Sequence, residues 1–232
     1  MTQDKKISSA LSDTTEEMRN SSQCASDSTL KATRSDTVVD AACPNSTLKE
    51  TCPNDTTQEF ATVKTRCMEL FKKKLSDYGT SWRLMRLASL TDQIYIKARR
   101  IRFIEEHQGQ ARVNEGILPE FVGIVNYGVI ALIQSKLGPG ADIPNKEAMA
   151  LYSEMYDEAT SLMLDKNHDY DEAWRQMRVS SFTDIILTKL RRIKQIEDHD
   201  GKTLVSEGVE AGYMDIINYS IFALIKLGYA NS

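Results

Sequence analysis

Residues 77–133 read DYGTSWRLMRLASLTDQIYIKARRIRFIEEHQGQARVNEGILPEFVGIVNYGVIALI, and the same pattern returns at residues 169–225. The two stretches align without a gap at a constant offset of 92 positions, and nearly half of the aligned residues are identical. A period of this length is too long for the unit of a solenoid. The chain is therefore interpreted as two fused copies of one domain, repeat 1 and repeat 2.

Each repeat carries three segments with the periodicity of helices. Apolar residues recur every three or four positions, Ser or Asn precedes most segments, and Gly follows them. The expected helices span 60–75, 89–107 and 114–137 in repeat 1, and 146–165, 181–199 and 206–227 in repeat 2. No segment alternates polar and apolar residues over any length, so the predicted fold class is all-α.

The first 56 residues differ from the rest in composition. They are rich in Ser, Thr, Asp and Asn, so they cannot bury enough apolar surface to offset the entropy of ordering. We expect a disordered low-complexity tail at 1–56, repeat 1 at 57–138 and repeat 2 at 144–228. Three of the four cysteines lie in the tail without the spacing of a disulfide framework or a zinc site. A redox or metal-binding arm is the alternative for this segment.

Composition and charge narrow the class of protein. Hydrophobic residues make up 41% and charged residues 27%, as in an ordinary globular chain, and the net charge of −4 argues against a dedicated nucleic-acid surface. No apolar run approaches the roughly 20 residues of a membrane span, and no signal peptide is visible. We expect a cytoplasmic protein without a membrane partner. The sequence leaves open whether the protein forms a homo-oligomer.

A lysine interrupts the apolar seam of the second helix in both repeats. In repeat 1 this seam consists of Leu90, Ile94, Lys97, Ile101 and Ile104. Lys189 occupies the equivalent place in repeat 2. A lysine among apolar residues is costly unless it has a partner or its ammonium reaches water. Two interpretations are open: a side chain that reaches solvent, or one that serves a ligand or a buried polar network.

The third helix of each repeat offers polar partners for these lysines. Asn126 and Asn218 lie inside its apolar face. Glu115 and Glu207 stand at its beginning, Glu120 lies nearby in repeat 1, and Asp215 lies one turn before Asn218 in repeat 2. Because buried polar groups need partners, we expect Lys97 and Lys189 to face the two asparagines, or Glu115 and Glu207.

Two further acids follow a serine at the start of the second helix. Asp92 and Asp184 complete the pattern Ser-x-x-Asp, which is similar to a helix capping box. An acid in the first turn also interacts favourably with the helix dipole. We therefore interpret both residues as helix-capping acids rather than metal ligands.

A tryptophan stands beside two arginines before the second helix in both repeats. The pattern consists of Trp82, Arg83 and Arg86 in repeat 1, and of Trp174, Arg175 and Arg178 in repeat 2. An aromatic face with planar donors suits a nucleobase and its phosphates, and it equally suits a core tryptophan with a stacked arginine. Arg100 and Arg192, later in the second helix, are candidates for phosphate binding or for a solvated surface.

Taken in order, these motifs resemble the nucleotide modification associated domain 1 family, in a duplicated form similar to bacteroidete versions. The resemblance covers about residues 57 to 228 and rests on Asp-Tyr-x-x-x-Trp-Arg, Ser-x-Thr-Asp, Lys-x-x-Arg-Ile, and Glu-Gly followed by Asn-Tyr-x-x-x-Ala-Leu. The family is similar in turn to MazG-like all-α nucleoside triphosphate pyrophosphohydrolases, in which paired acidic motifs hold magnesium over a triphosphate. The resemblance implies a MazG-like pseudo-twofold helical bundle. Lysine and arginines replace the first acidic motif here, and only Asp215 and Glu120 remain of the second.

Two functions are open from the sequence. One is a magnesium-dependent pyrophosphohydrolase of a canonical or modified nucleotide, linked to nucleotide modification or pool sanitation. The other is a non-catalytic nucleotide-binding or assembly module. The substrate-binding candidates are Trp82, Arg83, Arg86, Lys97, Arg100 and Asn126, with Trp174, Arg175, Arg178, Lys189, Arg192 and Asn218. The magnesium candidates are Glu115, Glu120, Glu207 and Asp215, and repeat 2 is favoured for the metal.

Overall fold

The computed structural model describes residues 55–107, 109, 115–199, 201 and 208–231. Nearly all of the predicted tail lies outside these residues. Its last residue, Thr56, belongs instead to the first helix and is 2% exposed. The Thr56 side chain donates a hydrogen bond to Glu172 and accepts one from Arg175 at 2.8 Å. The folded part therefore begins slightly before the boundary expected from composition.

All regular elements in the described residues are helices, which confirms the predicted all-α class. Repeat 1 consists of α1 (Asp55–Tyr78), the 3-10 helix η1 (Ser81–Leu84), α2 (Leu87–Glu106) and α3 (Leu118–Leu137). Repeat 2 follows the same order with α4 (Asn145–Asp169), η2 (Ala173–Gln176), α5 (Val179–Asp198) and α6 (Val209–Lys226). The apolar residues of the predicted α2 seam are all buried in the core.

The second helix of each repeat begins earlier than its serine suggested. The residues that precede α2 and α5 are Arg86 and Arg178, both with extended backbone and without a side-chain capping hydrogen bond. Asp92 and Asp184 therefore lie beyond the first turn, too far along the helix to cap it. The capping-box interpretation of these two acids is wrong, because their partners lie on another helix.

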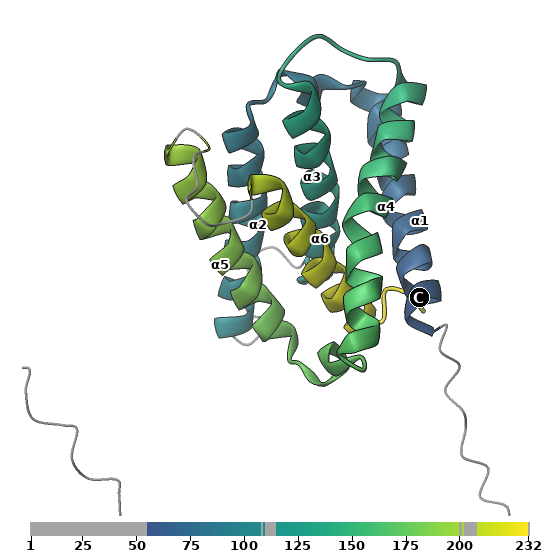
Figure 1. Ribbon diagram of the computed structural model, residues 1–232, viewed down its shortest axis with the longest axis vertical. Coiled ribbons are helices and arrows are strands. Elements are labelled where there is room, and N and C mark those ends of the chain that lie inside the picture. The colour runs from purple at the N-terminus through teal and green to yellow at the C-terminus, as the bar shows by residue number, and fades with distance from the viewer. Residues whose placement is uncertain (1–54, 108, 110–114, 200, 202–207, 232) are drawn as a thin grey trace, which may run out of the picture. The chain divides into compact units, whose positions relative to one another are not determined.

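Equivalent helices of the two repeats pack against each other. α3 contacts α6, α2 contacts α5 and α1 contacts α4, and Figure 1 shows the α3–α6 pair between the other two pairs. The ion pairs between α2 and α5 are reciprocal: Arg102 binds Asp184, and the equivalent Lys194 binds Asp92. Reciprocity of this kind is the signature of a twofold interface. The repeats thus form a pseudo-twofold bundle, as predicted.

A second reciprocal contact lies deeper between the same two helices. Thr91 donates a hydrogen bond to Glu197 at 2.7 Å, and the equivalent Thr183 donates one to Glu105 at 3.0 Å. Burial raises the pKa of both carboxyls above their usual range. The Tyr213 hydroxyl joins one half of the arrangement, 2.6 Å from the Thr91 hydroxyl. The α2–α5 interface therefore combines apolar packing with polar contacts that fix its register.

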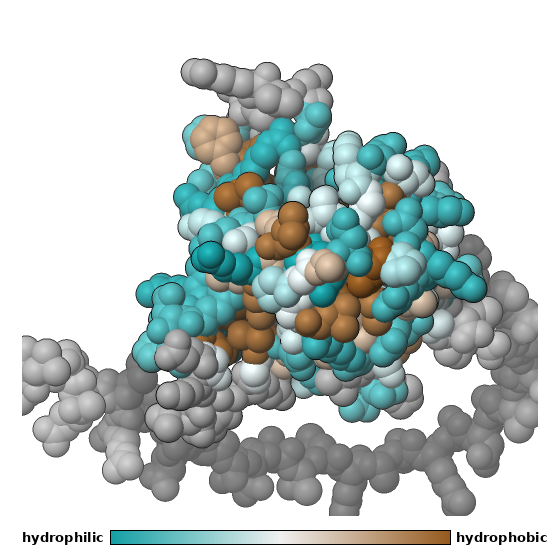
Figure 2. All heavy atoms as spheres, turned by 90° about the horizontal axis from the view of Figure 1, so that it is seen from above, coloured by the Kyte–Doolittle hydropathy of each residue, from teal (hydrophilic) through white to brown (hydrophobic). Residues whose placement is uncertain are grey.

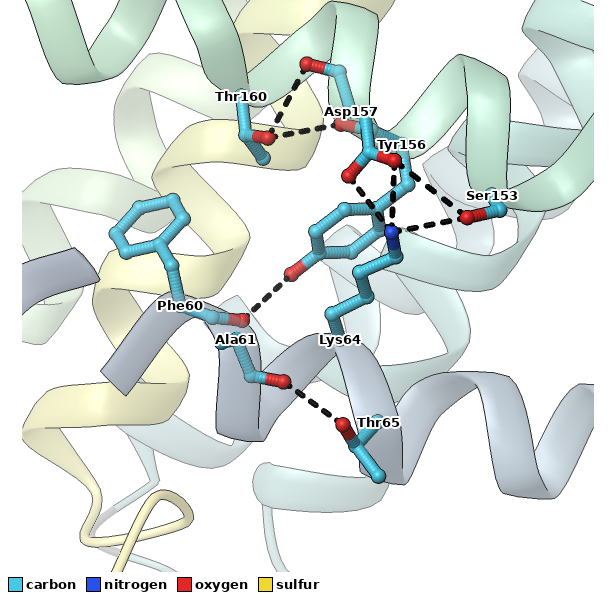
Figure 3. Close-up of polar contacts among 8 residues, drawn as sticks. All are labelled: Phe60, Ala61, Lys64, Thr65, Ser153, Tyr156, Asp157 and Thr160. Carbon is cyan, nitrogen blue, oxygen red and sulfur yellow. Dashed lines mark hydrogen bonds and ion pairs between the residues drawn. The ribbon is translucent and has the colours of Figure 1, made fainter. Parts of the chain in front are cut away.

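The contact between α1 and α4 departs from the symmetry. Lys64 on α1 donates hydrogen bonds to Ser153 at 2.9 Å and to the two carboxylate oxygens of Asp157 at 2.7 and 2.8 Å (Figure 3). The residue equivalent to Lys64 in α4 is Tyr156, whose hydroxyl donates to the Phe60 carbonyl at 3.4 Å. These positions precede the repeated stretches, so the two first helices have diverged more than the rest.

The central helix α3 is unusually apolar. By length and composition alone Leu118–Leu137 could cross a membrane, but 72% of this window is buried inside the bundle, as in the core helix of a folded domain. The expectation that no segment approaches a membrane span overlooked this helix. Gly128 lets α3 approach α6, since a Cβ there would lie 2.7 Å from the Ile217 side chain.

Candidate functional site

A cavity of about 410 Å³ lies in repeat 1 between the C-terminal half of α1, η1, α2 and α3. Its volume falls within the usual range of small-molecule sites. The aromatic and basic side chains that line it are Phe71, Tyr78, Trp82, Tyr127, Lys74 and Lys97. No carboxylate is among the described residues that line it. The cavity therefore combines ring faces with positive charge.

The end of the bundle where α1 and α3 end also exposes apolar side chains. Figure 2 views the molecule from this end and shows hydrophobic residues among hydrophilic ones. Tyr78 at the end of α1 is 68% exposed and Leu84 in η1 is 76% exposed. Since Tyr78 also lines the cavity, the aromatic wall continues to the protein surface.

Lys97 reaches the cavity from α2 and is held in place from α3. Its Nζ donates a hydrogen bond to Glu120 at 3.2 Å and lies 5.9 Å from the ring centroid of Tyr127. Gly123 gives the lysine stem its space, because a Cβ there would lie 2.8 Å from Lys97 Cε. One hydrogen bond to Glu120 leaves ammonium donors for a ligand. The lysine is therefore a cation that Glu120 orients at the cavity wall.

The carboxylate that holds Lys97 is shared with an arginine. Glu120 is 8% exposed and also accepts a hydrogen bond from Arg100. Arg100 donates in addition to the Glu115 carbonyl at 3.3 Å, and it lies 3.7 Å from the Glu115 carboxylate. Both predicted acids of repeat 1 are thus engaged by cations. The expected lysine partner was Asn126 or Glu115, and the structure shows Glu120 instead.

Asn126 presents a hydrogen-bond donor without a partner. The residue lines the cavity and is 7% exposed. Its Oδ1 accepts a hydrogen bond from the Tyr152 hydroxyl of α4 at 2.6 Å, and in the described part of the chain its Nδ2 has no partner. The indole Nε1 of Trp82 is likewise buried and unpaired among the residues described. The Trp174 Nε1 of repeat 2 is unpaired in the same way, so the accessible Asn126 Nδ2, which lies at the cavity, is the donor that a ligand can reach.

The two predicted arginines near Trp82 do not line the cavity. Arg83 is 5% exposed, and its guanidinium donates hydrogen bonds to the Gln134 side chain and to the Gly138 carbonyl at 2.6 Å. Arg83 therefore has a structural role, because its hydrogen bonds link η1 to the end of α3. Arg86 is exposed at the start of α2. The structure therefore brings together Trp82, Lys97 and Asn126, with Arg100 reached through Glu120.

Repeat 2 uses the equivalent residues for internal contacts. Lys189 pairs with Asp215, which stands where repeat 1 has Gly123. The Trp174 ring stacks on Phe222 with centroids 4.4 Å apart, at the position where repeat 1 has Ile130. Larger side chains thus stand at two positions that line the cavity in repeat 1.

The remaining candidates of repeat 2 are divided between the interior and the surface. Arg175 lies 4.5 Å from the Trp174 ring centroid and pairs with Glu59 and Glu172. Asn218 donates its Nδ2 to the Ala159 carbonyl at 2.7 Å. Arg178 and Arg192 are exposed. The predicted set of repeat 2 is therefore not gathered at one point.

Three of the four predicted magnesium ligands lie in the described residues, and each of these three is engaged by Lys or Arg. Glu207 lies outside the described residues, Asp215 is paired with Lys189, and Glu120 is shared by two cations. Among the described residues no three His, Cys, Asp or Glu side chains gather as they would around a metal ion. Magnesium binds oxygen ligands that are free to coordinate it, whereas these carboxylates already neutralise Lys or Arg. The described acids do not fit a magnesium site.

Several cavity residues were not among the candidates from sequence. Phe71 and Lys74 belong to the part of α1 that precedes the repeated stretch, so the comparison of repeats gave no signal for them. Tyr127 did carry a signal, because the pair Asn-Tyr occurs at the same place in both repeats. Ile130 differs between repeats, and a search for differences would have found it.

Comparison with known proteins places the chain in a family. Neither a curated protein nor a solved structure matches it. The family model for nucleotide modification associated domain 1 matches twice, at residues 74–135 and 166–227, so that each match covers the second and third helices of one repeat. The wider resemblance to MazG-like enzymes stays a prediction. The two matches together span more than half of the sequence, and the chain belongs to the nucleotide modification associated domain 1 family.

Proposed function

We propose that this protein binds a nucleotide in the cavity of repeat 1 and acts as a non-catalytic binding module. The observation that carries the proposal is the lining of the cavity: four aromatic side chains, two lysines and, among the described residues, no carboxylate. Aromatic faces bind a planar base, and lysines attract phosphate oxygens. Glu120, the carboxylate that holds Lys97, is not among the described lining residues and is itself paired with Arg100, which reduces its repulsion of an anionic ligand.

Within this proposal Lys97 binds phosphate and Trp82 lies against the base. Glu120 orients Lys97, and Gly123 leaves space for its stem. Arg100 neutralises Glu120 from the other side, so the charge of Lys97 stays available to the ligand. Lys74 on α1 adds a second positive charge at the same cavity. The ligand class is thus an aromatic base joined to phosphate.

The arrangement favours binding over metal-assisted hydrolysis. Such hydrolysis needs carboxylates that hold the ion and orient a water molecule. Glu120 and Asp215, the two acids that remain of the expected motif, are both engaged in ion pairs with lysine. We therefore propose that nucleotide binding needs no magnesium and that no pyrophosphate is released.

The equivalent lysines provide a matched test. Calorimetric titration with the four ribonucleoside monophosphates and triphosphates, in EDTA and then in magnesium, compares wild type with Lys97→Met and Lys189→Met. We expect the wild type to bind without magnesium, Lys97→Met to lose at least tenfold in affinity, which is about 1.4 kcal/mol, and Lys189→Met to bind like wild type. Circular dichroism checks that both variants are folded.

Three results would contradict the proposal. An equal loss in the two lysine variants would show that the site is not in repeat 1. No binding of any nucleotide by the wild type would remove the function itself. Magnesium-dependent release of pyrophosphate would establish a hydrolase in place of a binding module.

A further inference from the structure

We infer that Asn126 determines which base the cavity accepts, and that it selects bases with a carbonyl oxygen where cytosine or adenine has an amino group. Uracil, thymine and guanine belong to this class. The inference rests on the proposed function and goes further, because it names the chemical group that is read. It follows from the orientation of one buried amide.

The orientation of the Asn126 amide is fixed by a residue of the other repeat. Tyr152 on α4 is fully buried, and its ring stacks on Phe71 with centroids 4.5 Å apart. Burial raises the pKa of the Tyr152 hydroxyl well above its usual range, so it remains a donor. Within the described residues its acceptor is Asn126 Oδ1, at 2.6 Å. The amide oxygen must therefore face Tyr152, which leaves the NH₂ group for the cavity.

The NH₂ group of Asn126 has no partner among the described residues, and the residue, which is 7% exposed, lines the cavity. A ligand that brings a carbonyl oxygen supplies the missing acceptor. A ligand with an amino group at the same point brings two donors together, so it makes no hydrogen bond to Asn126 and displaces the water that this donor can reach. Sites built around a buried hydrogen bond discriminate strongly against analogues that lack its partner.

The equivalent amide in repeat 2 is oriented differently, so at this position an amide NH₂ without a partner among the described residues is particular to repeat 1. Asn218 donates its Nδ2 to the Ala159 carbonyl at 2.7 Å, and its Oδ1 is buried without a partner among the described residues. The position equivalent to Tyr152 is Phe60, which has no hydroxyl to offer. The free donor of Asn126 thus depends on a tyrosine that occurs in one of the two repeats.

The test measures selectivity in the full chain with UMP, CMP and ribose 5-phosphate as probes. By calorimetry we expect the wild type to bind UMP at least about tenfold more tightly than CMP. In Asn126→Asp the carboxylate accepts the Tyr152 hydroxyl and presents a second acceptor to the cavity. This variant should bind both nucleotides less tightly but prefer CMP.

A pair of tyrosine variants tests the fixed orientation. Tyr152→Phe removes the hydroxyl that fixes the amide, so the preference for UMP should fall below about threefold while the fold is kept. Tyr156→Phe, one turn further along α4, removes an equally buried hydroxyl that bonds to the Phe60 carbonyl. It should keep the wild-type preference.

The outcomes separate this inference from the proposed function. Equal affinity for UMP and CMP, with both bound more tightly than ribose 5-phosphate, would overturn the inference and leave nucleotide binding intact. If all three probes bind alike and Asn126→Asp weakens all of them equally, the amide contacts phosphate and the inference is again overturned. If no probe binds, the proposed function fails first.

Discussion

Repeat 1 and repeat 2 place equivalent lysines on equivalent helices and surround them differently. In repeat 1, Gly123 makes space for Lys97 beside a cavity, whereas in repeat 2 Asp215 pairs with Lys189. Ile130 lines the cavity in repeat 1. Its equivalent in repeat 2 is Phe222, whose ring packs on Trp174. The residues that differ at these two positions thus distinguish the repeat that has the cavity from the one whose equivalent positions are filled.

The largest expected effect concerns the aromatic packing of repeat 2. Phe222 is 7% exposed and contacts the rings of Phe60, Trp174 and Phe182. Phe222→Ala should lower the free energy of unfolding by about 3–5 kcal/mol, because it removes a ring from a filled core. Ile130→Ala should cost about 2 kcal/mol, at the low end for such changes, because its side chain already borders empty space. Urea unfolding measures the free energy of unfolding of both variants. Equal losses in the two variants would contradict the proposed difference in packing between the repeats.

Two glycines of α3 should respond differently to the same substitution. At Gly128 a new Cβ would lie 2.7 Å from Ile217 of α6, so Gly128→Ala should destabilise the fold by about 1–3 kcal/mol through overpacking. At Gly123 the nearest atoms belong to the flexible Lys97 stem, and the gain in helix propensity offsets its displacement. Gly123→Ala should change stability by less than about 1 kcal/mol but weaken nucleotide binding. Thermal unfolding and calorimetry on both variants check this, and equal stability losses would count against it.

The smallest expected effect concerns the reciprocal carboxyls Glu105 and Glu197. Their raised pKa means that the folded protein takes up protons at a higher pH than the unfolded chain does. The associated stability is fully present below the unfolded pKa and is lost as pH rises through the folded pKa. Glu197→Gln removes one such titration, so its Tm relative to wild type should be highest near neutral pH. The difference should shrink by a few degrees as pH falls to about 4. If thermal melts show the same Tm difference between Glu197→Gln and wild type at every pH in this range, the raised pKa of Glu197 is contradicted.

The helices could be predicted because they follow from local periodicity, whereas the pseudo-twofold bundle was implied by the family resemblance together with the duplication. The buried seam of α2 is an example, since Leu90, Ile94, Ile101 and Ile104 form one face at helical spacing. Glu120 as the partner of Lys97 could not be chosen over Asn126, because that choice depends on how α3 is rotated against α2. Asp92 was misread because an acid near a serine resembles a cap, whereas its partner Lys194 lies in the other repeat.

The cavity could not be predicted from the sequence either, because it depends on how side chains of several helices pack together. It combines α1, which precedes the repeated stretch, with a difference in side-chain volume between Ile130 and Phe222. The sequence favoured repeat 2 for the metal because Glu207 and Asp215 are spaced two helical turns apart there, whereas repeat 1 has Gly123 in place of Asp215. Empty space is a property of packing, and it becomes visible only when all neighbouring side chains are placed.

The central claim, that a nucleotide binds in repeat 1, is tested most directly by the two tryptophans of the chain, one in each repeat. Trp174→Phe leaves Trp82 as the single reporter at the cavity, and Trp82→Phe leaves Trp174 stacked on Phe222. Each variant is titrated with UMP while tryptophan emission is recorded. We predict a saturable change of emission when Trp82 remains and an unchanged emission when Trp174 remains. A saturable change at Trp174 together with none at Trp82 would contradict the account.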